Sequence, residues 1–222
     1  MNGADLAAWI RHAAELVSAD AERLTRLDAA IGDGDHGHNL DRGFRAAVDA
    51  LAGDALSDDA LSDDVPPGKV LVAAGRAIVS KTGGASGPLY GTLLRRAGKA
   101  LGDAAEVDAA ALGAALRAAL DGVRDLGKAA DGDKTMVDAL APAVAAYEAA
   151  LADGSDLAGC VRAAADAAAK GADDTVPMQA HKGRASYLGP RSVGHMDPGA
   201  SSTALLLRGL ADVTPAGGPG EG

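Results

Sequence analysis

The feature of this sequence that most constrains its fold is an apolar pattern with the period of an α-helix. Apolar residues recur every three or four positions in three stretches, so each stretch would present one continuous apolar face. These faces comprise Leu6, Trp9, Ile10, Ala13, Leu16 and Val17; Leu112, Leu116, Leu120, Val123 and Leu126; and Val137, Leu140, Val144, Tyr147 and Leu151. Weaker helical patterns cover 39–52, 67–80, 88–101, 156–170 and 199–211. We therefore predict eight helices joined by short loops.

Composition favours the same all-α class. Apolar residues make up 48% of the chain but aromatic residues only 2%. Most of the other apolar residues are alanine, the best helix former, and residues that favour strands are sparse. A chain of 222 residues suffices for one well-buried domain. We expect that domain to span 1–212, with a disordered tail over 213–222 that is poor in apolar residues. The acidic segment 53–68 is expected to be a solvated connector.

Charge and hydropathy argue against several classes of protein. The formal net charge is −10, so the chain as a whole has no electrostatic footprint for nucleic acid or an anionic membrane. No apolar run approaches the roughly 18 residues that span a bilayer. The N-terminal helical pattern contains Asp5, Arg11 and Glu15, unlike a signal peptide. A single cysteine, Cys160, is expected to be a buried thiol and fits a cytoplasmic location.

Glycine and polar residues collect in four segments between the helical patterns. These segments are IGDGDHGHN (31–39), KTGGASGP (81–88), GKAADGDKT (127–135) and HKGRASYLGPRSVGHMDPGAS (181–201). The last is long for a connection in a helical bundle, and long ordered loops in compact domains tend to be functional. If alternate helix ends converge, all four segments would share one rim of the bundle.

The first segment carries a candidate metal site. Asp28, Asp33 and Asp35 follow an i, i+5, i+7 spacing, and carboxylates brought this close repel one another unless a cation compensates. Oxygen ligands suit Mg²⁺. A simple polar turn is the alternative, because Asp-Gly pairs commonly form turns. An EF-hand does not fit, since Gly37 stands at its fifth ligand position and Phe44 in place of the bidentate glutamate.

Residues His36, Gly37, His38 and Asn39 directly precede a helical pattern. The free N–H groups and partial positive charge of a helix N-terminus would suit phosphate there. Two alternatives remain open. Zn²⁺ could bind His36 and His38, and Asn39 could serve as an ordinary helix cap.

The glycine-rich loop Gly83–Gly87 offers a second candidate phosphate site. Its small residues would let the backbone approach a phosphate, and Ser86 could donate a hydrogen bond. A Walker A motif is absent because Lys81 precedes the glycines. A tight turn before Pro88, a good first helical residue, explains the loop equally well.

The fourth segment ends in an apparent helix start, with Asp197 as the N-cap and Pro198 as the first helical residue. Capping does not explain the polar residues before it, which are Arg184, Tyr187, Arg191 and His195. Arginine forks match phosphate, although they could equally pair with surface carboxylates.

Taken together, four blocks of the chain resemble the DhaL family, the nucleotide-binding subunits of dihydroxyacetone kinases. The blocks are LDAAIGDGDHGHNLDRGF (27–44), SKTGGASGPLYGTLL (80–94), GKAADGDKTMVDALAP (127–142) and GRASYLGPRSVGHMDPGASS (183–202). They stand in the family's order across nearly the whole chain. Leu40, Pro190 and Met196 depart from the family's common Met, Glu and Gln. The resemblance implies a closed barrel of eight antiparallel amphipathic helices that binds nucleotide at one end.

The resemblance also implies site residues. Two Mg²⁺ ions would be held by Asp28, Asp33 and Asp35 and would bridge the phosphates of ADP or ATP. The phosphate side would be lined by His36, Gly37, His38, Asn39, Ala85 and Ser86. The base or ribose would be bordered by Gly127, Met136, Arg184, Asp197, Pro198 and Gly199.

Members of that family pass a phosphoryl group to dihydroxyacetone held covalently on a DhaK subunit. We therefore expect half an enzyme, whose bound ADP is recharged from phosphoenolpyruvate through a DhaM phosphocarrier. Alternatives are an ATP-exchanging kinase subunit for another ketose or a carrier-bound acceptor, and a nucleotide-dependent regulator of a transcription factor. A zinc-binding helical domain is a third alternative, and a homodimer is left open.

Overall fold

The computed structural model describes residues 1–52 and 65–215, and within them every regular element is helical. The all-α prediction is therefore confirmed. The elements are α1 (Gly3–Ile31), α2 (His36–Ala52), α3 (Pro67–Lys81), α4 (Ser86–Leu101), α5 (Ala109–Gly127), α6 (Val137–Ala152), α7 (Leu157–Asp174), the 3₁₀ helix η3 (Arg184–Ser192) and α8 (Pro198–Val213).

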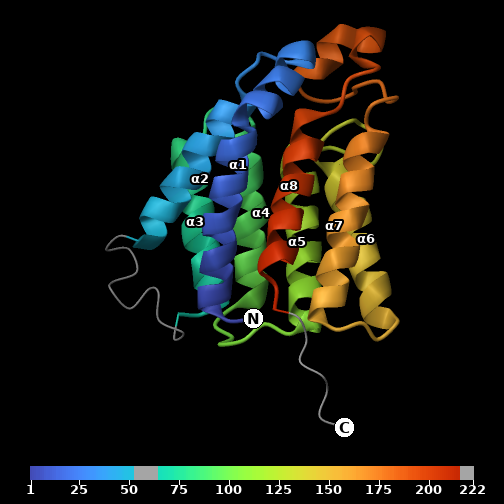
Figure 1. The fold of residues 1–222 in the computed structure, drawn as a ribbon. Helices are drawn as coiled ribbons and strands as arrows, with labels where there is room; N and C mark the ends of the chain where they lie inside the picture. The colour runs from blue at the N-terminus through green and yellow to red at the C-terminus, as the bar shows by residue number, and fades with distance from the viewer. Residues whose placement is uncertain (53–64, 216–222) are drawn as a thin grey trace.

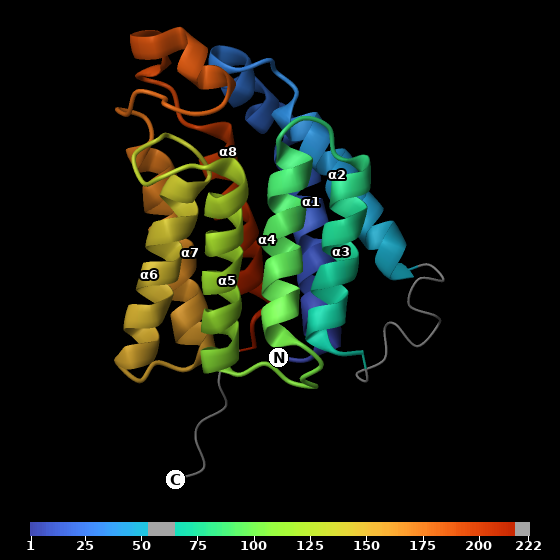
Figure 2. The ribbon, with the colours of Figure 1, turned by 180° about the vertical axis from the view of Figure 1, so that it is seen from behind.

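The eight α-helices run side by side and alternate in direction (Figures 1 and 2). Each packs against the next along the chain, and α8 also packs against α1, so the order of contacts forms a ring. The core draws on every helix, and its largest fully buried apolar or aromatic side chains include Phe44, Tyr90 and Tyr147. Leu40, one of the departures from the family pattern, is also fully buried in this core.

Glycine allows some of these helices to approach each other closely. A Cβ atom on Gly98 of α4 would lie 2.5 Å from the carbonyl oxygen of Gly68 in α3, and a Cβ on Gly68 would meet Gly98 at the same distance. Gly75 and Gly91, each seven residues from its counterpart in the first pair, form a similar close contact. The backbones of α3 and α4 are therefore in direct contact. Such close contacts allow dense packing in a chain that has few aromatic side chains to fill space.

Two helix starts differ from the sequence prediction. Helix α2 begins at His36, not at 39, because the Asp28 carboxylate accepts the N–H groups of Asp35 and His36. Asn39 therefore lies inside α2 and is not its cap, so that alternative is wrong. Helix α4 begins at Ser86, two residues before Pro88.

Other expectations about the chain are met at α8 and α7. Asp197 caps α8 by accepting the N–H of Ala200, with Pro198 at the first helical position. Cys160 is buried, as expected. Most of the connector 53–68 lies outside the described residues, as does the tail beyond 215. No helix in the described part of the chain is both long and apolar enough to cross a membrane.

The four glycine-rich polar segments all lie at one end of the bundle, at the top of Figures 1 and 2. This follows from the alternating directions, because the connections after α1, α3, α5 and α7 must emerge at the same end. The fourth connection contains η3, a 3₁₀ helix that the periodicity did not predict. The expected shared rim is therefore present.

Candidate functional site

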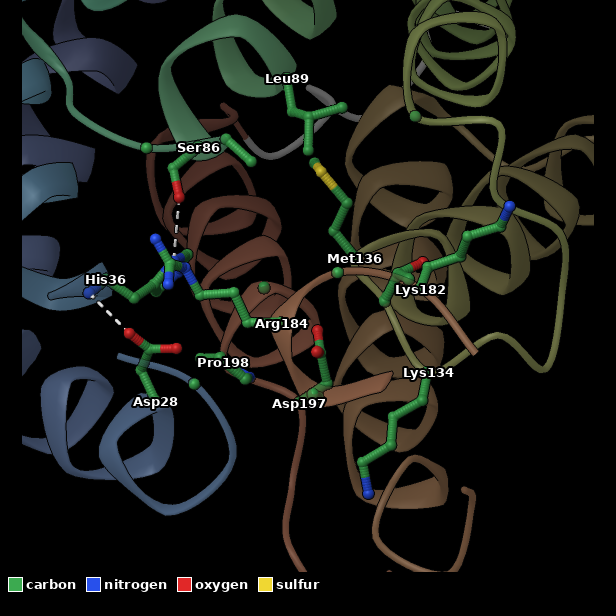
Figure 3. Close-up of a pocket in the computed structure, with 18 of the residues that line it drawn as sticks. Asp28, His36, Ser86, Leu89, Lys134, Met136, Lys182, Arg184, Asp197 and Pro198 are labelled. Atoms are coloured by element: carbon green, nitrogen blue, oxygen red, sulfur yellow. Dashed lines mark hydrogen bonds between the residues drawn. The ribbon is translucent and has the colours of Figure 1, made fainter. Parts of the chain in front are cut away.

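A cavity of about 310 Å³ opens at this end and is lined by residues of all four polar segments (Figure 3). Most of the residues singled out from sequence lie on its wall. They are Asp28, Asp33, Asp35, His36, Ala85, Ser86, Gly127, Met136, Arg184, Asp197, Pro198 and Gly199. Side chains separated by up to about 170 positions in the sequence thus converge on one pocket.

The acidic end of the pocket is formed by Asp28, Asp33 and Asp35. Each offers a carboxylate oxygen, and these three oxygens lie within 4.8 Å of one another. Asp28 is buried on the last turn of α1, whereas Asp33 and Asp35 are exposed on the following loop. That loop turns back through Gly34, whose φ of +74° favours glycine.

This donor set fits a hard divalent cation. One oxygen of Asp28 is fixed by the backbone N–H groups of Asp35 and His36, at 2.9 and 3.2 Å, so the carboxylate is held in place before any ion binds. The Arg184 guanidinium lies 3.0 Å from a carboxylate oxygen of Asp33, as expected where negative charge is concentrated. All ligand atoms are oxygens, which suits Mg²⁺ rather than a soft metal. A polar turn alone does not require this convergence.

His36 connects three helices through its imidazole ring. Its Nδ1 lies 3.0 Å from Ser86 Oγ on α4, and its Nε2 lies 2.8 Å from Ser202 Oγ on α8. Burial lowers the pKa of His36, although Asp28 and Asp35 oppose that shift. Both ring nitrogens already have hydroxyl partners, and His38 points toward Glu22 at 3.8 Å. This geometry does not favour a zinc site built on His36 and His38.

A buried hydroxyl chain continues from His36 into the core. Ser202 Oγ lies 2.6 Å from the hydroxyl of Tyr90, and that hydroxyl also donates to the carbonyl of Gly199 at 2.9 Å. Tyr90 and Ser202 escaped the sequence analysis, because each sits within a helical pattern that explained it as packing. The signal available was a tyrosine on an apolar face, since a buried hydroxyl needs a partner.

Gly37, His38 and Asn39 are not among the residues that line the cavity. A Cβ on Gly37 would lie 1.9 Å from the carbonyl oxygen of Ala21, so this glycine permits the close contact of α1 with α2. Asn39 is buried behind the glycine-rich loop, where a Cβ on Gly83 would approach its Oδ1 to 2.7 Å.

The opposite end of the pocket is more apolar. Leu89 of α4 and Met136 point toward each other across it (Figure 3), and Val123, Ala129 and Pro198 also contribute to the wall. An apolar slot beside an acidic cluster suits an amphipathic ligand with a flat ring at one end and charge at the other.

Arg184 contributes to the acidic end of the pocket. Its guanidinium pairs with Asp33 at the acidic end, and Figure 3 shows it reaching toward Asp28 and Ser86. Asp197 is buried, and burial raises its pKa to about 7. Arg184 and Asp197 both line the pocket.

Sequence analysis also missed the residues that shape the third segment. One carboxylate oxygen of Asp138 accepts the N–H of Gly132, and the other accepts the N–H of Thr135. Lys134, between them, is buried and has a φ of +62°. The repeated Asp-Gly-Asp pattern at 131–133 was the available signal.

Comparison with protein families finds a match to the DAK2 domain over residues 30–212. The chain is 38% identical over 203 residues to the PEP-dependent dihydroxyacetone kinase ADP-binding subunit DhaL of Escherichia coli K12, covering 91% of this chain and 93% of that one. It is 40% identical to the ADP-binding subunit DhaL of PEP-dependent dihydroxyacetone kinase 1 of Listeria innocua, covering 91% of this chain and 92% of that one.

Longer proteins match over part of their length. The chain is 42% identical to the D-erythrulose kinase of Mycolicibacterium smegmatis, covering 94% of this chain but 35% of that one. Among solved structures, the dihydroxyacetone kinase of C. freundii in complex with AMP-PNP and Mg²⁺ matches with a TM-score of 0.66 and 28% identity. That match covers 93% of this chain and 33% of the kinase.

Proposed function

The chain belongs to the DhaL family of DAK2-domain proteins, and we propose that it is the nucleotide-binding subunit of a dihydroxyacetone kinase. Its relatives are kinases of dihydroxyacetone and erythrulose, which makes it a phosphotransferase subunit. Relatives of the same length are ADP-binding subunits. The proposal rests on one observation: three converging carboxylates and an apolar slot lie in the same pocket.

In this proposal the nucleotide lies along the pocket with its phosphates at the acidic end. Asp28, Asp33 and Asp35 hold two Mg²⁺ ions that bridge the phosphates, since Mg²⁺ combines carboxylate and phosphate oxygens readily. The relative crystallised with AMP-PNP and Mg²⁺ supports both ligands. The base occupies the apolar slot beside Leu89 and Met136, lined further by Gly127, Pro198 and Gly199.

The phosphates are held by groups at the start of α4. Ser86 begins α4, where free N–H groups and the helix dipole favour an anion. Ala85 leaves room for the backbone to approach. Gly37 and His38 do not line the cavity, so we assign them an indirect role in the first turn of α2, where Gly37 lets α1 approach α2 and His38 lies beside Glu22. Asn39 acts indirectly, by supporting the glycine-rich loop from behind.

The chemistry then depends on position and charge. Bound Mg²⁺ neutralises negative charge on the transferred phosphoryl group and aligns it with the acceptor. Arg184, already at the acidic end, adds a cationic fork that matches phosphate. Asp28 needs little reorganisation because two N–H groups fix its carboxylate. We assign no general base to this chain, so the acceptor must be activated by the subunit that holds it.

Two phosphoryl sources are compatible with such a site. We propose that bound ADP is recharged from phosphoenolpyruvate through a phosphocarrier such as DhaM, because two relatives matched over more than nine-tenths of their length are PEP-dependent. In that role ADP stays bound as a cofactor in the cytoplasm. The 42% identity to a D-erythrulose kinase makes erythrulose a second candidate acceptor.

Reconstitution tests this assignment. The purified chain is mixed with a purified DhaK subunit and given dihydroxyacetone with either ATP or phosphoenolpyruvate plus the phosphocarrier proteins. We expect product only when DhaK is present, and faster turnover with phosphoenolpyruvate. Turnover of dihydroxyacetone by this chain alone would contradict the subunit assignment. Replacing dihydroxyacetone by D- or L-erythrulose in the same mixture identifies the preferred acceptor.

A further inference from the structure

Lys134 places a buried ammonium group at the base of the pocket wall. The residue is 1% exposed. Its Nζ donates to four backbone carbonyl oxygens, those of Thr175 (2.9 Å), Met178 (3.0 Å), Ser192 (2.7 Å) and His195 (2.5 Å). In Figure 3 its amino group points away from Ser86, Leu89 and Met136. The ammonium is therefore directed at protein backbone.

These carbonyls belong to both ends of one long connection, residues 175–197, which we call the covering loop. Thr175 and Met178 follow α7, whereas Ser192 and His195 end or follow η3. Lys134 itself comes from the connection between α5 and α6. One ammonium thus joins three stretches of chain at a single point.

Other hydrogen bonds close the covering loop at the same place. Gly194 donates its N–H to the carbonyl of Val176 at 2.8 Å, and His181 donates to the carbonyl of Asp133 at 3.0 Å. The Ser192 hydroxyl accepts the N–H of Ala180. The base of the loop is therefore fixed around Lys134, while its outer part carries the pocket residues Lys182, Gly183 and Arg184.

The ammonium is suited to this task and hard to replace. It offers three N–H donors on one atom and no acceptor, so it can serve these four converging carbonyls when one N–H is shared between two of them. Without it, buried carbonyl oxygens would lose their partners, which is costly. The left-handed backbone of Lys134 is itself held by Asp138, which accepts N–H groups on either side of it.

We propose that Lys134 is a positioning residue for the nucleotide: its ammonium preorganises the covering loop and so sets how long a bound nucleotide stays. The inference rests on the proposed nucleotide-binding function. If the loop becomes ordered only when the nucleotide binds, the free energy of ordering is subtracted from the binding free energy. The apparent affinity is then the intrinsic affinity multiplied by the fraction of free molecules whose loop is already ordered. Lys134 removes this cost without touching the ligand.

Lys134→Met tests the proposal, because it keeps a long unbranched side chain and deletes only the ammonium. Lys128→Met is the matched control, since Lys128 is exposed, also has a positive φ and lies in the same connection. Release of a fluorescent ADP analogue is followed by stopped flow with Mg²⁺ present. We expect Lys134→Met to release it about tenfold faster or more, and the control to stay within about twofold of the wild type.

Hydrogen exchange separates positioning from general stability. In Lys134→Met, amides of residues 176–195 should exchange faster while those of α1 to α5 keep their wild-type protection. Unchanged nucleotide release, or protection lost equally in all helices, would overturn the proposal. Lys134→Arg supplies a second variant: it keeps the charge but its planar fork cannot serve the same four carbonyls, so we expect partial recovery.

One measurement needs no variant. In the free wild-type protein, the amides of Ala180, His181 and Gly194 should already be protected, because the covering loop is ordered before nucleotide binds. If these amides become protected only with ADP and Mg²⁺, Lys134 does not preorganise the loop. If the wild type binds no ADP at all, the proposed function fails, and this exchange result still reports on the loop.

Discussion

At the scale of single residues, Asp197 couples the pocket to pH. Its carboxyl group is buried, and burial raises its pKa to about 7, against about 3.9 in an unfolded chain. A raised pKa means that the folded state binds the proton more tightly than the unfolded state. This contribution to stability is therefore full below about pH 4 and is lost as pH rises through about 7.

Asp197→Asn should remove that dependence while keeping a residue that caps α8 well. As pH rises from about 4 to about 8, the free energy of unfolding of the wild type should decrease by a few kcal/mol more than that of the variant. Urea titrations of both proteins across this range, without nucleotide, measure the difference. Parallel pH profiles would show that Asp197 does not titrate in this window.

The Tyr90 hydroxyl should matter for stability. Tyr90→Phe deletes a hydroxyl that bonds to Gly199 and lies within 3.0 Å of the hydroxyls of Ser202 and Thr203. Unpaired buried groups cost about 1–3 kcal/mol, so thermal and urea unfolding should show a loss of that size. Tyr187→Phe is the control, because Tyr187 is 87% exposed, and it should unfold like the wild type.

Site residues that are close together in the sequence could be predicted to cluster, whereas contacts between residues far apart in the sequence could not. Asp28, Asp33 and Asp35 lie within one short stretch, so their spacing alone indicated a cluster. One of the two hydroxyl partners of His36 is Ser202, 166 positions away, and no local pattern connects them. The ion pair of Arg184 with Asp33 could not be predicted from the sequence either, because it depends on the path of the covering loop.

At the scale of elements, the long helices were predictable and the irregular ones were not. The stripe that begins at Leu6 and the one that begins at Val137 form buried faces, except that Leu16 and Leu151 are only half-buried. In the stripe that begins at Leu112, Leu126 is 49% exposed at the end of α5. Helix α2 starts early because a side chain from another helix, Asp28, supplies the cap. Helix η3 has no apolar period, and contacts such as that of Lys134 with Ser192 hold it in place.

The close contact of α3 with α4 gives a test at this scale. Gly98→Ala would improve helix propensity by about 1 kcal/mol in an exposed helix, but here the new Cβ would press on the carbonyl of Gly68. We expect a net loss of about 1–3 kcal/mol in unfolding free energy. Lys99→Ala, at the exposed neighbouring position, serves as the control and should change little. A stabilised Gly98→Ala protein would mean that the helices can separate freely.

At the scale of the whole molecule, helix direction explains the site. Eight α-helices that alternate in direction send every second connection to the same end. The sequence could predict this convergence, because it required only a count of helices and the position of the polar segments. The shape of the cavity could not be predicted, because it depends on how the covering loop folds back over the bundle.

Under the proposed function, the acceptor side of the reaction lies on another subunit. In that proposal the pocket holds metal, phosphates and base, and this chain spans about a third of the matched kinase of C. freundii. A donor subunit of this kind should therefore bind nucleotide by itself, before any partner is added. Its nucleotide affinity is the property on which the whole account depends.

Calorimetric titration of the purified chain with ADP, with and without Mg²⁺, tests that property most directly when wild type is compared with Asp33→Asn. Asp103→Asn is the control, since Asp103 is exposed near the opposite end of the bundle and pairs with Lys69. We expect Mg²⁺-dependent binding to the wild type and to the control, and no measurable binding to a folded Asp33→Asn protein. Equal ADP affinity of wild type and Asp33→Asn, or binding that is indifferent to Mg²⁺, would contradict the proposed function.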